Sequence, residues 1–125
     1  MHEQELVTDI LQQIDEAAKT ILARFQPVSS AEDFTHSDAG REKLDAICMQ
    51  LIAIGESLKQ IDTITSQSLL RRYPQIEWKK AMGLRDIITH HYFDVNAEAI
   101  FDVCQTKIKP LMMVIETMLM DLQRK

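Results

Sequence analysis

Residues 44–61, LDAICMQLIAIGESLKQI, decide the fold. Apolar residues recur there every three or four positions, which is the spacing of one face of an α-helix rather than the alternation of a strand. Charged and polar residues fall mostly between them, so we expect a helix with one side in a core. Ser37 is a suitable N-cap, which places this helix over residues 38–61. The stripe that faces the core consists of Leu44, Ile47, Cys48, Leu51, Ile54, Gly55, Leu58 and Ile61.

The same helical spacing covers most of the remaining chain. We expect a first helix over residues 3–25, a third over residues 77–91, and a last one that begins near residues 96–97 and bends at Pro110. Short helical turns are expected near residues 29–32 and over residues 66–72. Only three glycines and three prolines occur in 125 residues, and no run alternates like a strand. The sequence therefore predicts an all-α protein with one domain over residues 1–125, folded as an up-and-down bundle of four main helices plus short helical turns.

Composition and charge narrow the classes of function. The first ten residues lack the basic start and apolar run of a signal peptide, and no window approaches a membrane span, so we expect a cytoplasmic protein with no membrane partner. Cys48 and Cys104 fall inside apolar helical patterns, which indicates reduced core residues. The net charge of −5 disfavours non-specific nucleic-acid binding. Residues 71–91 are the exception, because they hold five basic and two acidic side chains.

Residues 81–93, AMGLRDIITHHYF, begin like a core helix and end in a cluster of titratable groups. At about 100° per residue, Asp86 and His90 are neighbours one turn apart, so Asp86 can accept a hydrogen bond that orients His90. Tyr92 returns to the side of Arg85. Arg85 and His90 diverge by about 140° on a regular helix. Either the helix frays at its end, or two copies of the protein share one cleft.

Arginine and histidine in this cluster suit phosphate chemistry. Arg85 can bind a phosphate in a fork, and His90 can move protons near neutral pH. The sequence has no His-x-x-x-His, no Cys-x-x-Cys, no nucleophile elbow and no glycine-rich phosphate loop, so we expect neither a metal site nor a cofactor. RNA supplies its own 2′-hydroxyl nucleophile, and cleavage then needs only a base or acid and an anion stabiliser. Structural roles also fit, since a helix C-terminus attracts histidine and Arg85 can pair with a carboxylate.

The cluster resembles a known motif. Arg85, His90 and Tyr92 match the R-x-x-x-x-H-x-Y motif of HepT-type toxins in the HEPN superfamily. The run Ile54-Gly55-Glu56 resembles the Ile-Gly-Glu signature in the family's second helix, and residues 73–103 resemble its segment from Pro and Trp through the motif to the last helix. The resemblance covers nearly the whole chain and is strongest over residues 40–115.

The resemblance implies a HEPN-like fold and a homodimeric, metal-independent endoribonuclease that acts as a toxin on RNA, with tRNA among the candidate substrates. Arg85 and His90 are its implied catalytic residues, in a cleft built from two protomers. It also implies a partner, an MNT-type nucleotidyltransferase antitoxin similar to MntA, which transfers AMP to Tyr92. The family most often has Asn after the motif arginine. Asp86 stands there in this chain and adds negative charge beside the phosphate site.

The residues around the motif are expected to support the cleft, to pack helices together or to contact RNA. Glu56 and Asp86 are expected to support the cleft, although Glu56 can equally be an exposed or capping residue. Gly55 and Gly83 interrupt good helices, which predicts close approach between helices at both positions. Three residues are candidate RNA contacts or plain surface residues: Lys79, Lys80 and His91.

Two other interpretations remain. The first is a non-catalytic subunit that binds a nucleotide or substrate and presents it to a nucleotidyltransferase. Such a subunit should be harmless when expressed without its partner, whereas a toxin should not. The second is a histidine phosphotransfer bundle, which also displays histidine on four helices. Tyr92, Phe93 and Asp94 follow the two histidines, instead of the Lys-Gly step of those domains, and this disfavours the second interpretation.

Overall fold

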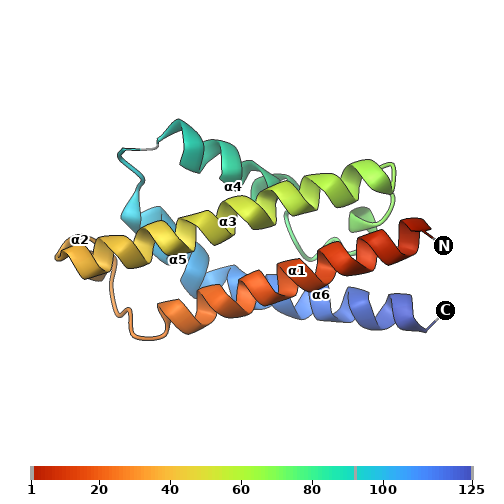
Figure 1. Cartoon of the computed structure of the whole chain (residues 1–125), viewed down its shortest axis with the longest axis horizontal. Coiled ribbons are helices and arrows are strands. Elements are labelled where there is room, and N and C mark those ends of the chain that lie inside the picture. Colours follow the sequence, from red (N-terminus) through yellow and green to blue (C-terminus); the bar gives the residue numbers. More distant parts are fainter. Residues whose placement is uncertain (1, 92, 125) are drawn as a thin grey trace.

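The computed structural model describes residues 2–91 and 93–124, and within them the chain is all-helical (Figure 1). These residues contain six α-helices and one 3-10 turn, and no strand. The order is α1 His2–Phe25, α2 Glu32–Thr35, α3 Asp38–Ile64, η1 Leu70–Arg72, α4 Trp78–His90, α5 Ala97–Thr106 and α6 Ile108–Gln123. The predicted all-α bundle is therefore confirmed.

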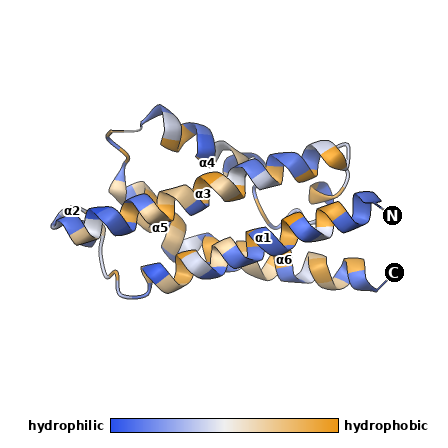
Figure 2. Cartoon of the chain, in the orientation of Figure 1, coloured by the Kyte–Doolittle hydropathy of each residue, from blue (hydrophilic) through white to orange (hydrophobic). Residues whose placement is uncertain are grey.

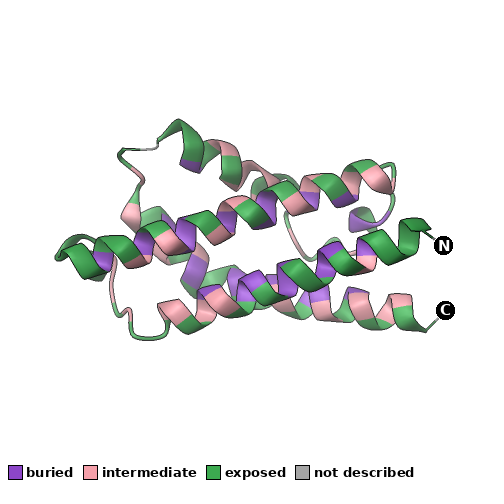
Figure 3. Ribbon diagram, in the orientation of Figure 1, coloured by how far each residue is buried: buried purple, intermediate pink, exposed green. Residues whose placement is uncertain are grey.

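The long helices pack side by side in a fixed order. α3 lies between α4 and α1, and α1 in turn packs against α6 (Figure 1). The inward side of each helix is apolar and the outward side polar (Figure 2), and burial follows the same division (Figure 3). α4 sits at the edge of the bundle and is anchored there by two buried residues, Trp78 and Ile88. The rest of its surface is half-buried or exposed.

α3 forms as the apolar pattern of residues 44–61 predicts. Ser37 is its N-cap, because the Ser37 Oγ accepts a hydrogen bond of 3.0 Å from the backbone N–H of Gly40. The helix continues to Ile64, three residues beyond the predicted end at Ile61. Every residue of the predicted stripe is buried: Leu44, Ile47, Cys48, Leu51, Ile54, Gly55, Leu58 and Ile61.

The last helix is broken rather than bent. α5 ends at Thr106 and α6 begins at Ile108, so the prediction of one continuous helix was wrong. Pro110 lacks an N–H, and its ring clashes with the carbonyl four residues earlier, which belongs to Thr106. The break places Pro110 in the first turn of α6, where no backbone N–H is needed for an intrahelical bond. The predicted start near residues 96–97 is correct, since α5 begins at Ala97 and the Asn96 side chain accepts from the N–H of Ala99 at 3.1 Å.

The predicted short helix over residues 66–72 is only a 3-10 turn, Leu70–Arg72. Ser66 and Gln67 have positive φ values of 52° and 63°, which end α3 in the left-handed region. The N–H of Gln67 bonds to the carbonyl of Asp62 at 2.8 Å, as in a helix C-terminal cap. Glycine normally fills such positions, so the sequence carried no signal for this turn.

The two cysteines are confirmed as free, buried core residues. Cys48 lies on α3 and Cys104 on α5, and both side chains are buried. Burial raises the pKa of the Cys48 thiol to about 11 and that of Cys104 to about 12. Separately, none of the helices in the described part of the chain is long and apolar enough to cross a membrane.

The two glycines predicted at helix contacts differ. A Cβ at Gly55 would lie 3.2 Å from the Met82 carbonyl oxygen and 3.4 Å from the Cβ of Arg85, so α3 and α4 do approach closely there. A Cβ at Gly83 would meet no atom within 4 Å. The prediction was therefore correct for Gly55 and wrong for Gly83, because Gly83 faces away from α3.

This difference predicts opposite effects of one substitution. Gly83→Ala should raise the free energy of unfolding by about 1 kcal/mol, since alanine is the better helix former and nothing in the chain obstructs it. Gly55→Ala should lower it by roughly 1–3 kcal/mol, because α4 must move away from α3. Urea denaturation followed by circular dichroism, at protein concentrations where the chain is a monomer, measures both. A loss of stability in both variants would contradict the assigned facing of Gly83.

Candidate functional site

The start of α4 is fixed by a chain of two hydrogen bonds. The Trp78 Nε1 donates to the Tyr73 carbonyl at 2.9 Å, and the Tyr73 hydroxyl donates to the Asp121 carboxylate on α6 at 2.7 Å. Burial, and then the bond to Asp121, raise the pKa of Tyr73 to about 12, so its hydroxyl stays protonated as the donor. These contacts tie the start of α4 to α6.

Four charged side chains form a row across the α3–α4 contact. The Arg85 Nε lies 2.8 Å from the Glu56 Oε1, and its Nη1 lies 3.1 Å from the Asp86 Oδ1. The Asp86 Oδ2 lies 3.7 Å from the Lys59 Nζ. We call Glu56, Arg85, Asp86 and Lys59 the charged row. Because all four side chains are 40–48% exposed, they remain within reach of a ligand.

The charged row corrects the expected role of Asp86. Its carboxylate bonds to Arg85 and pairs with Lys59, and among the described residues it makes no hydrogen bond to His90, which the helical spacing suggested. The hydrogen bond from Arg85, followed by the charge of Lys59, holds the pKa of Asp86 below its usual value. Asp86 is therefore ionised at neutral pH, and Lys59 offsets the negative charge that it brings beside Arg85. Two cations and two carboxylates alternate along the row, so a phosphate must compete with Glu56 and Asp86 for Arg85.

His90 lies on a different side of α4. Gly83, Ile87 and His90 are spaced by four and three residues, which places them on one face of the helix. This face is open: Ile87 is 59% exposed, His90 is exposed, and no atom approaches the Cβ position of Gly83. The predicted divergence of Arg85 and His90 is thus present, and α4 remains regular up to His90.

α3 carries a large exposed apolar residue on the same face as Glu56. Met49 precedes Glu56 by two helical turns and is 65% exposed. Ile87 on α4 is 59% exposed, so each of the two helices that carry the charged row also has one large exposed apolar side chain. Exposed apolar residues beside polar groups often mark a contact surface.

The other predicted residues are dispersed along α4 and beyond it. Lys79 and Lys80 are exposed in the first turn of α4, and ten residues of helix, about 15 Å, separate Lys80 from His90. Lys80 pairs with Glu77 at 3.3 Å, and His91 lies 3.7 Å from Asp94. Tyr92, the predicted modification site, lies outside the described residues. No group of three His, Cys, Asp or Glu side chains suited to a metal ion occurs among residues 2–91 and 93–124.

Lys59 is the residue that sequence reasoning missed. It follows Gly55 by one helical turn, and Gly55 is where α3 meets α4, so Lys59 must border the same contact. That spacing was the available signal. The spacing could not be used from the sequence alone, because the sequence does not show that the Gly55 face of α3 packs against α4 rather than against another helix.

The fold and the site together describe a class of protein, an all-helical HEPN-like bundle with an arginine–histidine motif at the edge of its third long helix. Residues 10–118 match the model of the ribonuclease HepT-like family. The chain therefore belongs to the HepT-like ribonuclease family, as the sequence resemblance predicted.

Similar proteins in the archaeon Methanocaldococcus jannaschii are also named as ribonucleases. "Putative RNase MJ0127" is 33% identical over 78 residues, which are 62% of this chain and 61% of that protein. The chain thus matches less than two thirds of that relative's length. "Putative RNase MJ0125" is 26% identical over 117 residues, which are 94% of this chain and 90% of the relative. No solved structure matches the chain.

Proposed function

We propose that this protein is a metal-independent endoribonuclease toxin whose active cleft forms between two copies of the chain. Arg85 and His90 are its catalytic residues, and Glu56, Asp86 and Lys59 position Arg85. One observation carries the proposal: Arg85 lies in the charged row on one side of α4, and His90 is open to solvent on another side. The chain that shows this arrangement belongs to a ribonuclease family. One chain does not bring both groups to the same atom.

The proposed reaction uses the 2′-hydroxyl of the RNA. This hydroxyl attacks the adjacent phosphorus while the bond to the 5′-oxygen of the next nucleotide breaks. His90 either accepts the proton of the 2′-hydroxyl or gives a proton to the leaving oxygen. Arg85 exchanges its carboxylate partners for the phosphate and neutralises the charge that develops on it. The products are a 2′,3′-cyclic phosphate and a 5′-hydroxyl.

The proposed dimer packs two α4 helices near a two-fold axis, with the open face of each helix against the edge of the partner's charged row. Gly83 offers no side chain to obstruct a second helix, and Ile87 supplies apolar surface to bury. Symmetry then repeats each contact, so the His90 of one protomer approaches the Arg85 of its partner and two equivalent half-sites result. Lys79 and Lys80 would lie along the path of the RNA about 15 Å from His90 and hold neighbouring phosphates.

Mixed protomers test the shared cleft. Arg85→Ala and His90→Ala proteins should each be inactive alone, and an equal mixture should regain about one quarter of wild-type activity, because half of the dimers are mixed and each has one intact half-site. Fluorescent labels on the two variants report subunit exchange in the same sample. If exchange is complete and activity does not return, Arg85 and His90 do not act across a dimer.

Regulation of the proposed toxin depends on a second protein. The partner is a nucleotidyltransferase antitoxin of the MNT type, and its target is Tyr92, two residues after the end of α4. The alternative function is a non-catalytic HEPN subunit that binds a nucleotide or substrate for such a nucleotidyltransferase. The partial neutralisation of Arg85 by Glu56 and Asp86 favours that alternative, because it leaves less positive charge to stabilise the transition state of cleavage. Growth arrest on expression of the chain alone would exclude it.

A further inference from the structure

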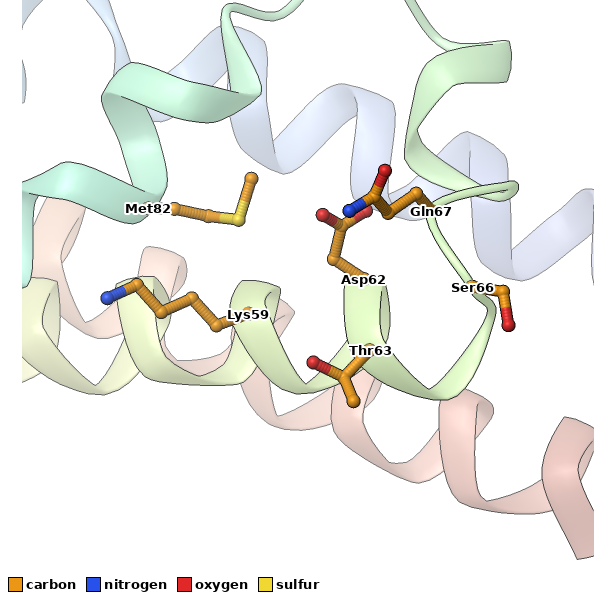
Figure 4. A pocket seen from close by; sticks show the side chains of 6 residues that line it. All are labelled: Lys59, Asp62, Thr63, Ser66, Gln67 and Met82. Atoms are coloured by element: carbon orange, nitrogen blue, oxygen red, sulfur yellow. The ribbon is translucent and has the colours of Figure 1, made fainter.

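A surface pocket lies directly beside the charged row. It has a volume of about 560 Å³ and lies between the end of α3, the turn that follows, and α4 (Figure 4). This volume is within the range of pockets that hold small ligands. Its lining residues are Lys59, Asp62, Thr63, Ser66, Gln67 and Met82.

Lys59 connects the pocket to the site of the proposed cleavage. Its ammonium group pairs with Asp86, and Asp86 bonds to Arg85. Figure 4 shows Lys59 and Met82 facing each other across one end of the pocket, while Asp62 and Gln67 lie together at the other. A nucleotide whose phosphate reaches Lys59 would therefore place its base near Asp62 and Gln67.

The far end of the pocket offers free hydrogen-bonding groups. Within the described residues, the side chains of Asp62 and Gln67 have neither a hydrogen bond nor an ion pair. The backbone of Gln67 is held at a φ of 63°, a conformation that glycine adopts more readily.

We propose that this pocket binds the nucleoside beside the scissile phosphate and that it selects guanine. An ionised carboxylate only accepts hydrogen bonds. Guanine is the RNA base whose pairing edge presents two adjacent donors, N1–H and N2–H₂, and these match the two oxygens of Asp62. The Gln67 amide can donate to the guanine O6, and the Met82 thioether offers a polarizable surface to the base. The inference rests on the proposed function in taking RNA as the ligand.

Binding of single nucleotides tests the pocket without any cleavage. Titration of the wild-type protein with 5′-GMP, and separately with AMP, CMP and UMP, can be followed through the methyl resonance of Met82. We expect GMP to bind about ten-fold more tightly than AMP, the discrimination expected of one bidentate contact. Asp62→Asn should abolish this preference, because an amide presents one donor and one acceptor. Equal affinity for all four nucleotides would overturn the proposal.

A glycine variant separates binding from folding. Gln67→Gly relieves a positive φ, so it should fold at least as stably as the wild type. The matched control is Gln26→Gly, which removes an exposed glutamine side chain from the turn after α1, outside the pocket. Gln67→Gly should weaken GMP binding several-fold, and Gln26→Gly should leave it unchanged. Equal GMP affinity in the two variants would remove Gln67 from the site.

Sequencing of the ends produced from a random RNA pool then connects the pocket to the cleavage. We expect guanosine to be enriched about ten-fold at one position flanking the cut, and Asp62→Asn to remove this enrichment while cleavage continues. Cleavage with no base preference, together with no GMP preference, would overturn this inference and leave the proposed function intact. A GMP preference in a protein that cuts no RNA would keep the guanine pocket and refute the proposed function.

Discussion

Arg85→Ala and His90→Ala should each lower the rate of RNA cleavage by about 10²–10⁴-fold, the usual cost of removing one anion stabiliser or one proton-transfer group. Arg85 lies between two carboxylates at 2.8 and 3.1 Å, so its loss removes the positive charge that holds them and leaves a site that repels phosphate. His90 is exposed and outside the core, so its loss should leave the fold unchanged. Cleavage of labelled RNA by the purified variants measures both effects.

Controls for these variants lie at the opposite end of the bundle. The start of α1 and the end of α6 lie close together there (Figure 1), and a hydrogen bond of 3.1 Å joins the Gln4 side chain to the Leu122 carbonyl. His2→Ala and Arg124→Ala remove the same two side-chain types from exposed positions at that end. Both should cleave at the wild-type rate. Full activity in His90→Ala would remove the assignment of His90 to proton transfer.

Tyr92→Phe should leave the protein toxic and make it resistant to the antitoxin. In the proposed modification, the Tyr92 oxygen attacks the α-phosphate of ATP, a phosphodiester bond to AMP forms, and pyrophosphate leaves. Each AMP brings a negative charge and a purine to a position seven residues after Arg85, where the charge competes for Arg85 and the base obstructs the RNA. Phenylalanine keeps the ring and removes the acceptor. Co-expression with the antitoxin should therefore rescue growth for the wild type and fail for the variant.

Intact mass spectrometry gives this prediction a direct readout. The chain has two tyrosines, so the assignment is simple. Incubation with the antitoxin, ATP and Mg²⁺ should add AMP-sized increments to the wild type and none to Tyr92→Phe. Tyr73→Phe is the matched control, because the Tyr73 hydroxyl already bonds to Asp121 and should accept no AMP. If the Tyr92→Phe protein is modified and silenced as readily as the wild type, the switch lies elsewhere.

The helices of this protein are predictable because each has a clear apolar stripe. The stripe of α3 is buried at every predicted position, and Ser37 caps the helix as expected. Local conformation is harder to predict where it depends on non-glycine residues with positive φ. Ser66 and Gln67 end α3 in this way, and nothing in their side chains indicates it.

The candidate site was predictable in its residue types and only partly in its geometry. The spacing of Arg85 and His90 correctly indicated that they diverge, since α4 is regular between them. The partners of Asp86 were not predictable, because Lys59 comes from another helix and its approach depends on how α3 and α4 pack. Gly55 and Gly83 show the same limit: both interrupt a helix, and only the position of the neighbouring helix distinguishes them.

The central claim, that the chain is a ribonuclease in which RNA supplies the nucleophile, is tested most directly by the ends of the products. Purified wild-type protein is incubated with a labelled single-stranded RNA and with tRNA in the presence of excess EDTA. We predict cleavage that leaves a 2′,3′-cyclic phosphate and a 5′-hydroxyl, because the 2′-hydroxyl attacks the adjacent phosphate. Intact RNA, or products with a 5′-phosphate formed only when a divalent metal is present, would contradict the account.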